Sequence, residues 1–264
     1  MMKPSTTASL TTGLLLAAFH AASAQIDTSR SPRHEFAISA GIARTDQLDA
    51  TASPLAFGGQ GSELLARYAR RSDRTLFSIA AGGGVRGLSS TRTAVGAGER
   101  LTAGDIAIGL ERVVARTPGV SSFSLGAELS GAVNWTAHRY QDPTQAVSNF
   151  IIGTVTLGPA ATMQRAFGGG VARIGVSVPL VGVVDHPYSD SRGSNAAIQP
   201  RFATASSLRG GTLTLAYAPA ATRRIGLEYA YRIRVLDYAD LQPMRTASQS
   251  LLVGIVTRFG GAGR

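Results

Sequence analysis

Histidines and acids are the side chains of this sequence that could transfer protons or bind a metal, and they are few. Beyond residue 33 the histidines are His34, His138 and His186. The grouping nearest to the acid–histidine pair of a hydrolase is Asp185-His186 with Asp142 or Asp190. Neighbouring residues of an extended chain point in opposite directions, so Asp185 and His186 pair poorly. The chain has no cysteine, which excludes disulfides and thiolate chemistry. We therefore expect no catalytic residue, no metal site and no cofactor.

A second set of charged residues occupies alternate positions of otherwise small-residue or apolar segments. Its members are Glu63, Arg67, Arg86, Asp105, Glu111, Glu128, Arg173, Glu228, Arg232, Arg234 and Arg258. Alternate residues of a strand face the same side of a sheet, so these side chains share one face if the segments are strands. The run 82–87 (GGGVRG) superficially resembles a phosphate-binding loop. It lies in such an alternating segment and has no lysine, which favours small residues on a crowded face.

The N-terminal segment has the features of an export signal. Lys3 is followed by the apolar run 10–19 and then by Ala22-Ser23-Ala24, a small-x-small cleavage pattern. A run of ten apolar residues is too short to span ~30 Å of bilayer as a helix, which disfavours a membrane anchor. We expect residues 1–24 to be a signal peptide cleaved after Ala24, and residues 25–33 to be a short periplasmic tail.

The remainder of the chain alternates with a period of two. In the segment 122–135, Phe123, Leu125, Leu129, Val133 and Trp135 alternate with small or polar residues. The same pattern predicts ten strands, near 34–44, 61–72, 75–86, 101–113, 121–135, 147–158, 170–184, 206–218, 224–235 and 248–259, with twelve as the alternative count. Each is long enough to cross a bilayer as a tilted strand, which takes ~9–11 residues.

The predicted connections alternate in length. Long gaps fall at 45–60, 87–100, 136–146, 185–205 and 236–247, and short ones at 73–74, 114–120 and 219–223, with 159–169 as the exception. Long loops at one end and short turns at the other are typical of a transmembrane antiparallel up-and-down β-barrel. Aromatic residues near the strand ends, namely Tyr68, Trp135, Tyr217 and Phe259, fit interfacial girdles.

Two alternatives account less well for these segments. A soluble secreted β protein would also alternate, but its second face would carry more charge than the Gly, Ala and Ser seen here. The uncharged stretch 143–164 could be a membrane helix, although its two prolines and its Val155-Thr156 pair favour a strand. Pro179 within the seventh strand is expected to mark a bulge.

The C-terminal stretch Ser250–Phe259 alternates and ends in an aromatic residue, and it resembles the last strand of bacterial outer-membrane barrels. The segment 227–231 (LEYAY) is similar to the last hairpin of small porin-family barrels. The resemblance implies a Gram-negative outer-membrane barrel over 34–259 with a tail at 260–264. It also implies insertion by the barrel assembly machinery, with Gly254 and Phe259 in the insertion signal.

Function follows from the lumen and the loops of such a barrel. Acids and arginines that interlock across the lumen would plug it, whereas arginines around a water-filled gap would favour anions. We expect a non-enzymatic barrel, acting as a structural or surface-interaction protein or as a narrow, anion-preferring pore for small solutes. The alternative is a membrane-embedded hydrolase acting on lipid or peptide near His138 and His186.

The basic balance of the chain does not indicate nucleic acid as a partner. The formal net charge is +10, but the arginines are scattered singly apart from the pairs Arg70-Arg71 and Arg223-Arg224. No basic stripe with interleaved aromatic residues appears, as a nucleic-acid surface would require. Outer-membrane lipid is the better partner for this charge in an exported protein.

Overall fold

The computed structural model describes residues 34–49, 53–90, 98–117, 120–139, 149–185, 200–219, 224–239 and 243–260. The strands are β1 (His34–Asp49), β2 (Ser53–Arg71), β3 (Thr75–Ser90), β4 (Gly98–Thr117), β5 (Ser121–Arg139), β6 (Asn149–Phe167), β7 (Gly170–Ser177), β8 (Val181–Asp185), β9 (Pro200–Thr204), β10 (Leu208–Ala218), β11 (Ile225–Tyr238) and β12 (Met244–Phe259). The predicted signal peptide, the 25–33 tail and residues 261–264 lie outside the described residues.

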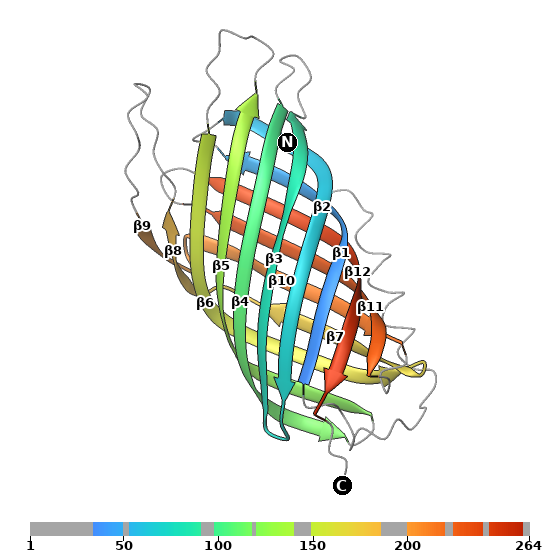
Figure 1. Ribbon diagram of the computed structural model, residues 1–264. Helices are drawn as coiled ribbons and strands as arrows, with labels where there is room; N and C mark the ends of the chain where they lie inside the picture. The colour runs from blue at the N-terminus through green and yellow to red at the C-terminus, as the bar shows by residue number, and fades with distance from the viewer. Residues whose placement is uncertain are drawn as a thin grey trace, which may run out of the picture.

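Ten of these strands close into an antiparallel barrel (Figure 1). Around the ring the order is β1, β2, β3, β4, β5, β6, β7, β10, β11 and β12, and β12 pairs with β1 to close it. Antiparallel pairing of each strand with both of its neighbours leaves no open edge in the ring. The expected up-and-down barrel of ten strands is therefore confirmed.

The two additional strands, β8 and β9, are short and lie at one side of the long-loop end (Figure 1). β8 continues along β6 where β7 stops, with one extra residue on its side of the ladder. Pro159 and Pro179 both lie at this break, where each lacks an N–H that a regular ladder would use. The strand expected over 170–184 is thus interrupted, and Pro179 lies in the break between β7 and β8 rather than in a bulge of one strand. β9 is a strand in a range that was expected to be loop.

Several expected loops are shorter than predicted, including 87–100, where β3 runs to Ser90 and β4 begins at Gly98, and 236–247, where β11 runs to Tyr238 and β12 begins at Met244. The range 159–169 was expected to be a long connection, but β6 runs to Phe167 and turns within Gly168-Gly169, both at positive φ. Two consecutive residues at positive φ suit a tight hairpin whose twist matches the strands, and glycine adopts them without a Cβ clash. The range 45–60 was expected to be a long loop, but β1 extends to Asp49 and β2 begins at Ser53.

Residues 149–167 form a strand, so the alternative of a membrane helix over 143–164 is wrong. Within the described part of the chain, no helix is long and apolar enough to cross a membrane.

The outer surface of the barrel carries an apolar band of bilayer height. On β4 the outward-facing residues from Leu110 to Thr102 are uncharged, and exposed arginines stand at both ends, Arg112 and Arg100. Twelve residues span about 40 Å along a strand and about 28 Å along the axis at a tilt of ~45°. The strand therefore carries its first charges at the two depths where a bilayer presents its headgroups.

Candidate functional site: the barrel lumen

The charged residues singled out from the sequence face the inside of the barrel. Ten of the eleven line a cavity of about 240 Å³ in the middle of the lumen. The eleventh, Arg258, is buried and contacts Glu35 on β1. A cavity of this size and polarity has room for several water molecules. The chemistry of the site therefore depends on how these charges pair.

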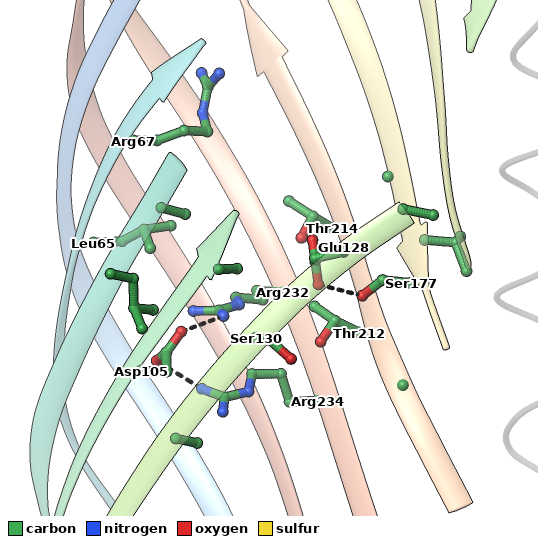
Figure 2. A pocket seen from close by; sticks show the side chains of 18 of the residues that line it. Leu65, Arg67, Asp105, Glu128, Ser130, Ser177, Thr212, Thr214, Arg232 and Arg234 are labelled. Carbon is green, nitrogen blue, oxygen red and sulfur yellow. Dashed lines mark hydrogen bonds and ion pairs between the residues drawn. The ribbon is translucent and has the colours of Figure 1, made fainter. Parts of the chain in front are cut away.

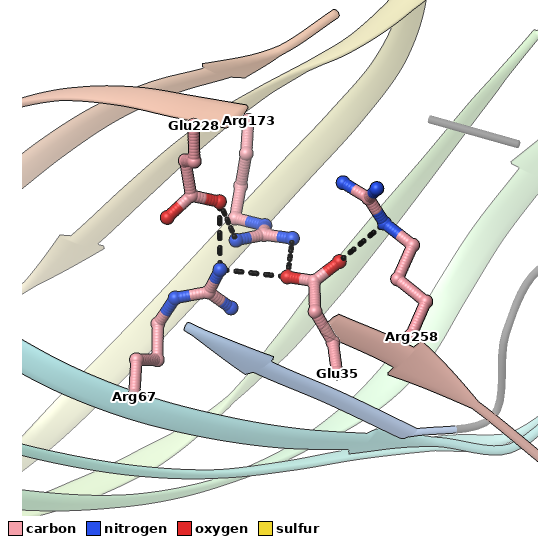
Figure 3. Close-up of polar contacts among 5 residues, drawn as sticks. All are labelled: Glu35, Arg67, Arg173, Glu228 and Arg258. Carbon is pink, nitrogen blue, oxygen red and sulfur yellow. Dashed lines mark hydrogen bonds and ion pairs between the residues drawn. The ribbon is translucent and has the colours of Figure 1, made fainter. Parts of the chain in front are cut away.

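Five charged side chains meet near the short turns and form what we call the turn-end network (Figure 3). They are Glu35 of β1, Arg67 of β2, Arg173 of β7, Glu228 of β11 and Arg258 of β12. Glu35 Oε1 accepts hydrogen bonds from Arg67 Nη2 at 2.6 Å and from Arg173 Nη2 at 2.7 Å. Glu228 Oε2 lies 2.7 Å from Arg67 Nη2 and 3.5 Å from Arg173 Nη1. Arg258 Nε lies 3.4 Å from Glu35 Oε2.

A second group, the central network, lies deeper in the barrel, and Figure 2 shows three of its members, Asp105, Arg232 and Arg234. It consists of Glu63 of β2, Arg86 of β3, Asp105 of β4, and Arg232 and Arg234 of β11. Arg232 Nη2 and Arg234 Nη1 each lie 2.6 Å from one oxygen of Asp105. Glu63 pairs with Arg86 at 2.6 Å and lies 3.5 Å from Arg232 Nη1. β4 and β11 are diametrically opposite in the ring of ten, so the contacts of Asp105 bridge the full lumen.

The remaining two acids of the lumen, Glu111 and Glu128, accept hydrogen bonds from hydroxyl groups on β5, β6 and β7. Thr162 Oγ1 donates to Glu111 at 2.8 Å, and Ser124 donates to the other oxygen of Glu111. Ser177 Oγ donates to Glu128 at 2.7 Å (Figure 2). Each of the two networks holds three arginines and two acids, which leaves one positive charge in excess per network. The carboxylates of Glu111 and Glu128 offset those two positive charges. The charged side chains assigned to the lumen are therefore balanced rather than strongly cationic.

An apolar layer fills the lumen toward the long-loop end. One cluster comprises Ile152, Val184, Ala203, Leu208, Tyr238 and Met244, and a second comprises Phe57, Leu88 and Leu101. Leu101 and Leu208 are each 1% exposed and Met244 is fully buried, so these side chains pack as a protein core does. Moving inward from the long loops, the lumen thus passes from an apolar layer to the central cavity and then to the turn-end network.

The sequence analysis missed two parts of this site. Glu35 shares the inward face with Ala37 and Ser39, so alternation within the first strand could have identified it. The apolar layer could not be identified in this way. Residues such as Phe57, Leu88 and Met244 fell in expected loops, because the strands extend further toward the long-loop end than their apolar outer faces suggested.

The candidate hydrolase residues are only partly described. Asp185 ends β8 and His138 lies in β5, while His186, Asp142 and Asp190 lie outside the described residues, as does the side chain of His138. His34 Nδ1 lies 2.8 Å from the Tyr68 hydroxyl, and its ring stacks on Phe259. Among the described residues, no three His, Cys, Asp or Glu side chains gather where they could hold a metal.

No model of a known protein family matches the chain, and no curated protein matches its sequence. Among solved structures, the outer membrane protease OmpT from Escherichia coli is similar, with a TM-score of 0.55 and 9% identity over 87% of this chain and 98% of OmpT. The translocator domain of the autotransporter NalP from Neisseria meningitidis has a TM-score of 0.46 and 8% identity over 94% of this chain and 93% of its own. OprG from Pseudomonas aeruginosa has a TM-score of 0.34 and 7% identity over 88% of this chain and 98% of its own.

These structures are outer-membrane β-barrel proteins, and the similarity to OmpT supports the same fold for this chain. The chain thus has the fold of an outer-membrane β-barrel, as its last strand suggested. At 9% identity, the similarity to OmpT supports a shared fold and carries no information about activity.

Proposed function

We propose that the chain is a non-enzymatic outer-membrane β-barrel with a filled lumen, which acts as a structural or surface-interaction protein. The observation that carries the proposal is the contact of Asp105 with Arg232 and Arg234, which joins opposite walls at 2.6 Å. Side chains that meet across a barrel leave no continuous aqueous path of the kind that wider porin barrels enclose. Function then rests on the outer surface and on the long-loop end.

The outer-membrane location is supported by three features. The N-terminal pattern predicts export, the band between Arg112 and Arg100 has bilayer height, and the inner face is crowded and charged while the outer face is apolar. In this proposal the barrel assembly machinery inserts the chain, and membrane lipid is the partner of the apolar band.

A narrow, anion-preferring pore is the second candidate, and one observation favours it. Arg234 keeps 31% of its side chain exposed to the cavity although one of its nitrogens is bound to Asp105. A guanidinium at the edge of a wet gap attracts anions. The balanced charges of the lumen and the apolar layer beyond it weigh toward the filled barrel.

Single-channel recording separates the two candidates. The mature chain is refolded into planar bilayers at two salt concentrations, and insertion is checked independently by heat-dependent electrophoretic mobility. Insertion without discrete conductance steps is the expected result. Discrete steps with an anion-selective reversal potential would overturn the filled barrel and favour the pore, with Arg234→Gln as the next variant.

A further inference from the structure

One wall of the central cavity is rich in hydrogen-bond donors. Arg234 of β11 lies directly opposite Thr212 of β10 on one side and opposite Ser248 of β12 on the other. Ser248 in turn lies opposite Thr45 of β1, and Thr246 is two residues from Ser248, on the same face of β12. All five residues line the cavity of about 240 Å³. A guanidinium group therefore lies among four hydroxyl groups, and we call these five residues the donor patch.

Arg234 is the most open member of the central network. Its Nη1 atom lies 2.6 Å from Asp105, yet 31% of the side chain stays exposed, whereas Arg232 and Asp105 are less than a tenth exposed. The central network holds three arginines and two acids, so its local charge is positive although the charges of the whole lumen balance. Since a guanidinium carries five N–H donors, Arg234 keeps donors for a ligand in the cavity.

Two hydroxyl groups of the donor patch lack a partner within the described part of the chain. The Oγ1 atoms of Thr45 and Thr246 are buried, and neither has a hydrogen-bond partner there. Leaving a buried hydroxyl unpaired costs stability, so such groups normally bind protein, water or a ligand. Because both residues line the cavity, a ligand in the cavity can supply the missing partner.

The chemistry of the donor patch favours an anion over a cation. Guanidinium groups only donate hydrogen bonds, and hydroxyl groups can donate to an anion. A cation would be repelled by Arg232 and Arg234, and the carboxylate of Asp105 is already bound by both. Among small anions, a planar carboxylate suits a guanidinium because its two oxygens match two neighbouring N–H groups.

The remainder of the cavity suits a short apolar chain. Ala103 of β4, Ala132 of β5, Ala216 of β10 and Ala230 of β11 also line it. Its volume equals that of about eight water molecules at ~30 Å³ each. A single monatomic ion would leave most of this space unfilled, whereas a carboxylate of a few carbon atoms would occupy it.

The cavity approaches the short-turn end of the barrel but not the long-loop end. The apolar layer closes it toward the long loops. In the other direction its lining continues to Leu76, Glu111 and Gln164, and Gln164 also lines a small pocket among the turns. A ligand would therefore enter and leave by the short-turn end, which is compatible with a filled lumen.

We propose that the donor patch binds the carboxylate of a small monocarboxylate, whose short chain lies among the alanines of the cavity. Arg234 supplies the charge, and the hydroxyl groups of Thr45 and Thr246 supply donors that otherwise stay unpaired. The inference goes beyond the proposed function, because it gives a non-conducting barrel a site for a solute on its short-turn side.

Urea unfolding of the refolded chain in lipid vesicles, with sodium acetate or sodium butyrate added, tests the proposal. A ligand that binds only the folded chain lowers the equilibrium constant of unfolding about tenfold at ten times its dissociation constant. We expect this response in the wild type, with about fourfold tighter binding for each methylene that butyrate adds. A midpoint that neither salt shifts would overturn the site. Equal effects of chloride and butyrate would overturn the carboxylate as its ligand.

The double variant Thr45→Val with Thr246→Val removes the two hydroxyl groups at constant charge and nearly constant shape. Without carboxylate it should be at least as stable as the wild type, because the hydroxyl groups it loses are unpaired. It should need at least about tenfold more carboxylate for the same response, given about one kilojoule-scale hydrogen bond lost per hydroxyl. Where it does not refold, Arg234→Gln serves instead and should likewise lose the response.

The matched control is Thr162→Val, which removes a lumen hydroxyl that donates to Glu111 on the far side of the barrel. This variant should be less stable than the wild type but should keep the full carboxylate response. An equal response in the wild type, the control and the double variant would overturn the donor patch in favour of a general salt effect.

The outcome is separable from that of the proposed function. A chain that inserts without conductance steps and gains no stability from carboxylates overturns this site and leaves the filled barrel standing. Discrete conductance steps overturn the filled barrel, whatever the response to carboxylates.

Discussion

At the scale of single residues, the barrel buries charge that only its partners make tolerable. Asp105 and Arg232 are each less than a tenth exposed, and they are hydrogen bonded at 2.6 Å across the lumen. A buried ion pair adds little over a well-packed apolar pair, but removal of one partner leaves an uncompensated charge. The central network therefore acts as a set of cross-links that fail when one member is lost.

Replacing Asp105 with asparagine tests this view. Arg232 and Arg234 both lose their nearest charge, so the free energy of unfolding should fall by about 3–5 kcal/mol. Urea unfolding of the refolded chain in lipid vesicles measures it. The matched control is Asp46→Asn, whose ion pair with Arg44 is more than half exposed and should be worth at most about 1 kcal/mol. Similar losses of unfolding free energy in the two variants would contradict the view that the lumen charges stabilise the barrel by cross-linking its walls.

At the scale of the strands, β1 and β12 approach each other closely where the ring closes. A Cβ at Gly254 would overlap the Ser39 side chain and the carbonyl oxygen of Ile38 on the facing strand. Glycine is needed there because the two backbones approach too closely for any side chain. The residue that the last-strand pattern marked as part of an insertion signal thus also permits the ring to close.

Gly254→Ala should therefore weaken the join between the two strands. Overpacking of this kind costs about 1–3 kcal/mol, and here it should also reduce the fraction of chain that refolds. Heat-dependent electrophoretic mobility and the urea midpoint report both effects. Gly104→Ala is the control, because a Cβ there would lie 3.9 Å from its nearest neighbour, the Gly82 carbonyl oxygen. An unchanged urea midpoint and refolded fraction in Gly254→Ala would contradict this role, because they would show that β1 and β12 can accommodate a side chain between them without loss of stability.

Strand periodicity predicts which side of the sheet a side chain faces, but not which other side chains it contacts. It placed Glu228 and Arg232 on one face of one strand, because side chains alternate strictly along a strand. It could not pair Arg67 with Glu228, which are 161 residues apart and meet only after the ring closes. It also missed β9, because Pro200–Thr204 is short and its pattern is hidden beside Pro200.

At the scale of the whole molecule, the outer face of the barrel decides between a membrane protein and a soluble secreted one. Trp135, the one tryptophan of the chain, lies on that face at the long-loop end of the band and is 51% exposed. Tyr68 and Phe259 lie at the opposite end. Aromatic residues at both ends of an apolar band suit the two interfaces of a bilayer.

Tryptophan fluorescence provides the test. Trp135 should be quenched by lipids brominated near the headgroup more than by lipids brominated near the chain end. A tryptophan moved to mid-band, in Leu129→Trp with Trp135→Phe, should reverse that order. Absence of quenching by either lipid would instead support the soluble secreted β protein.

The pairing of the first strand with the last also sets the order of events in assembly. His34 faces Phe259 across the final ladder, so the ring cannot close before both terminal strands are present. Until then both terminal strands are open templates for pairing with other chains, and their unpaired backbone groups are costly in lipid. A truncation that removes β12 would consequently cost closure of the whole ring rather than a single strand.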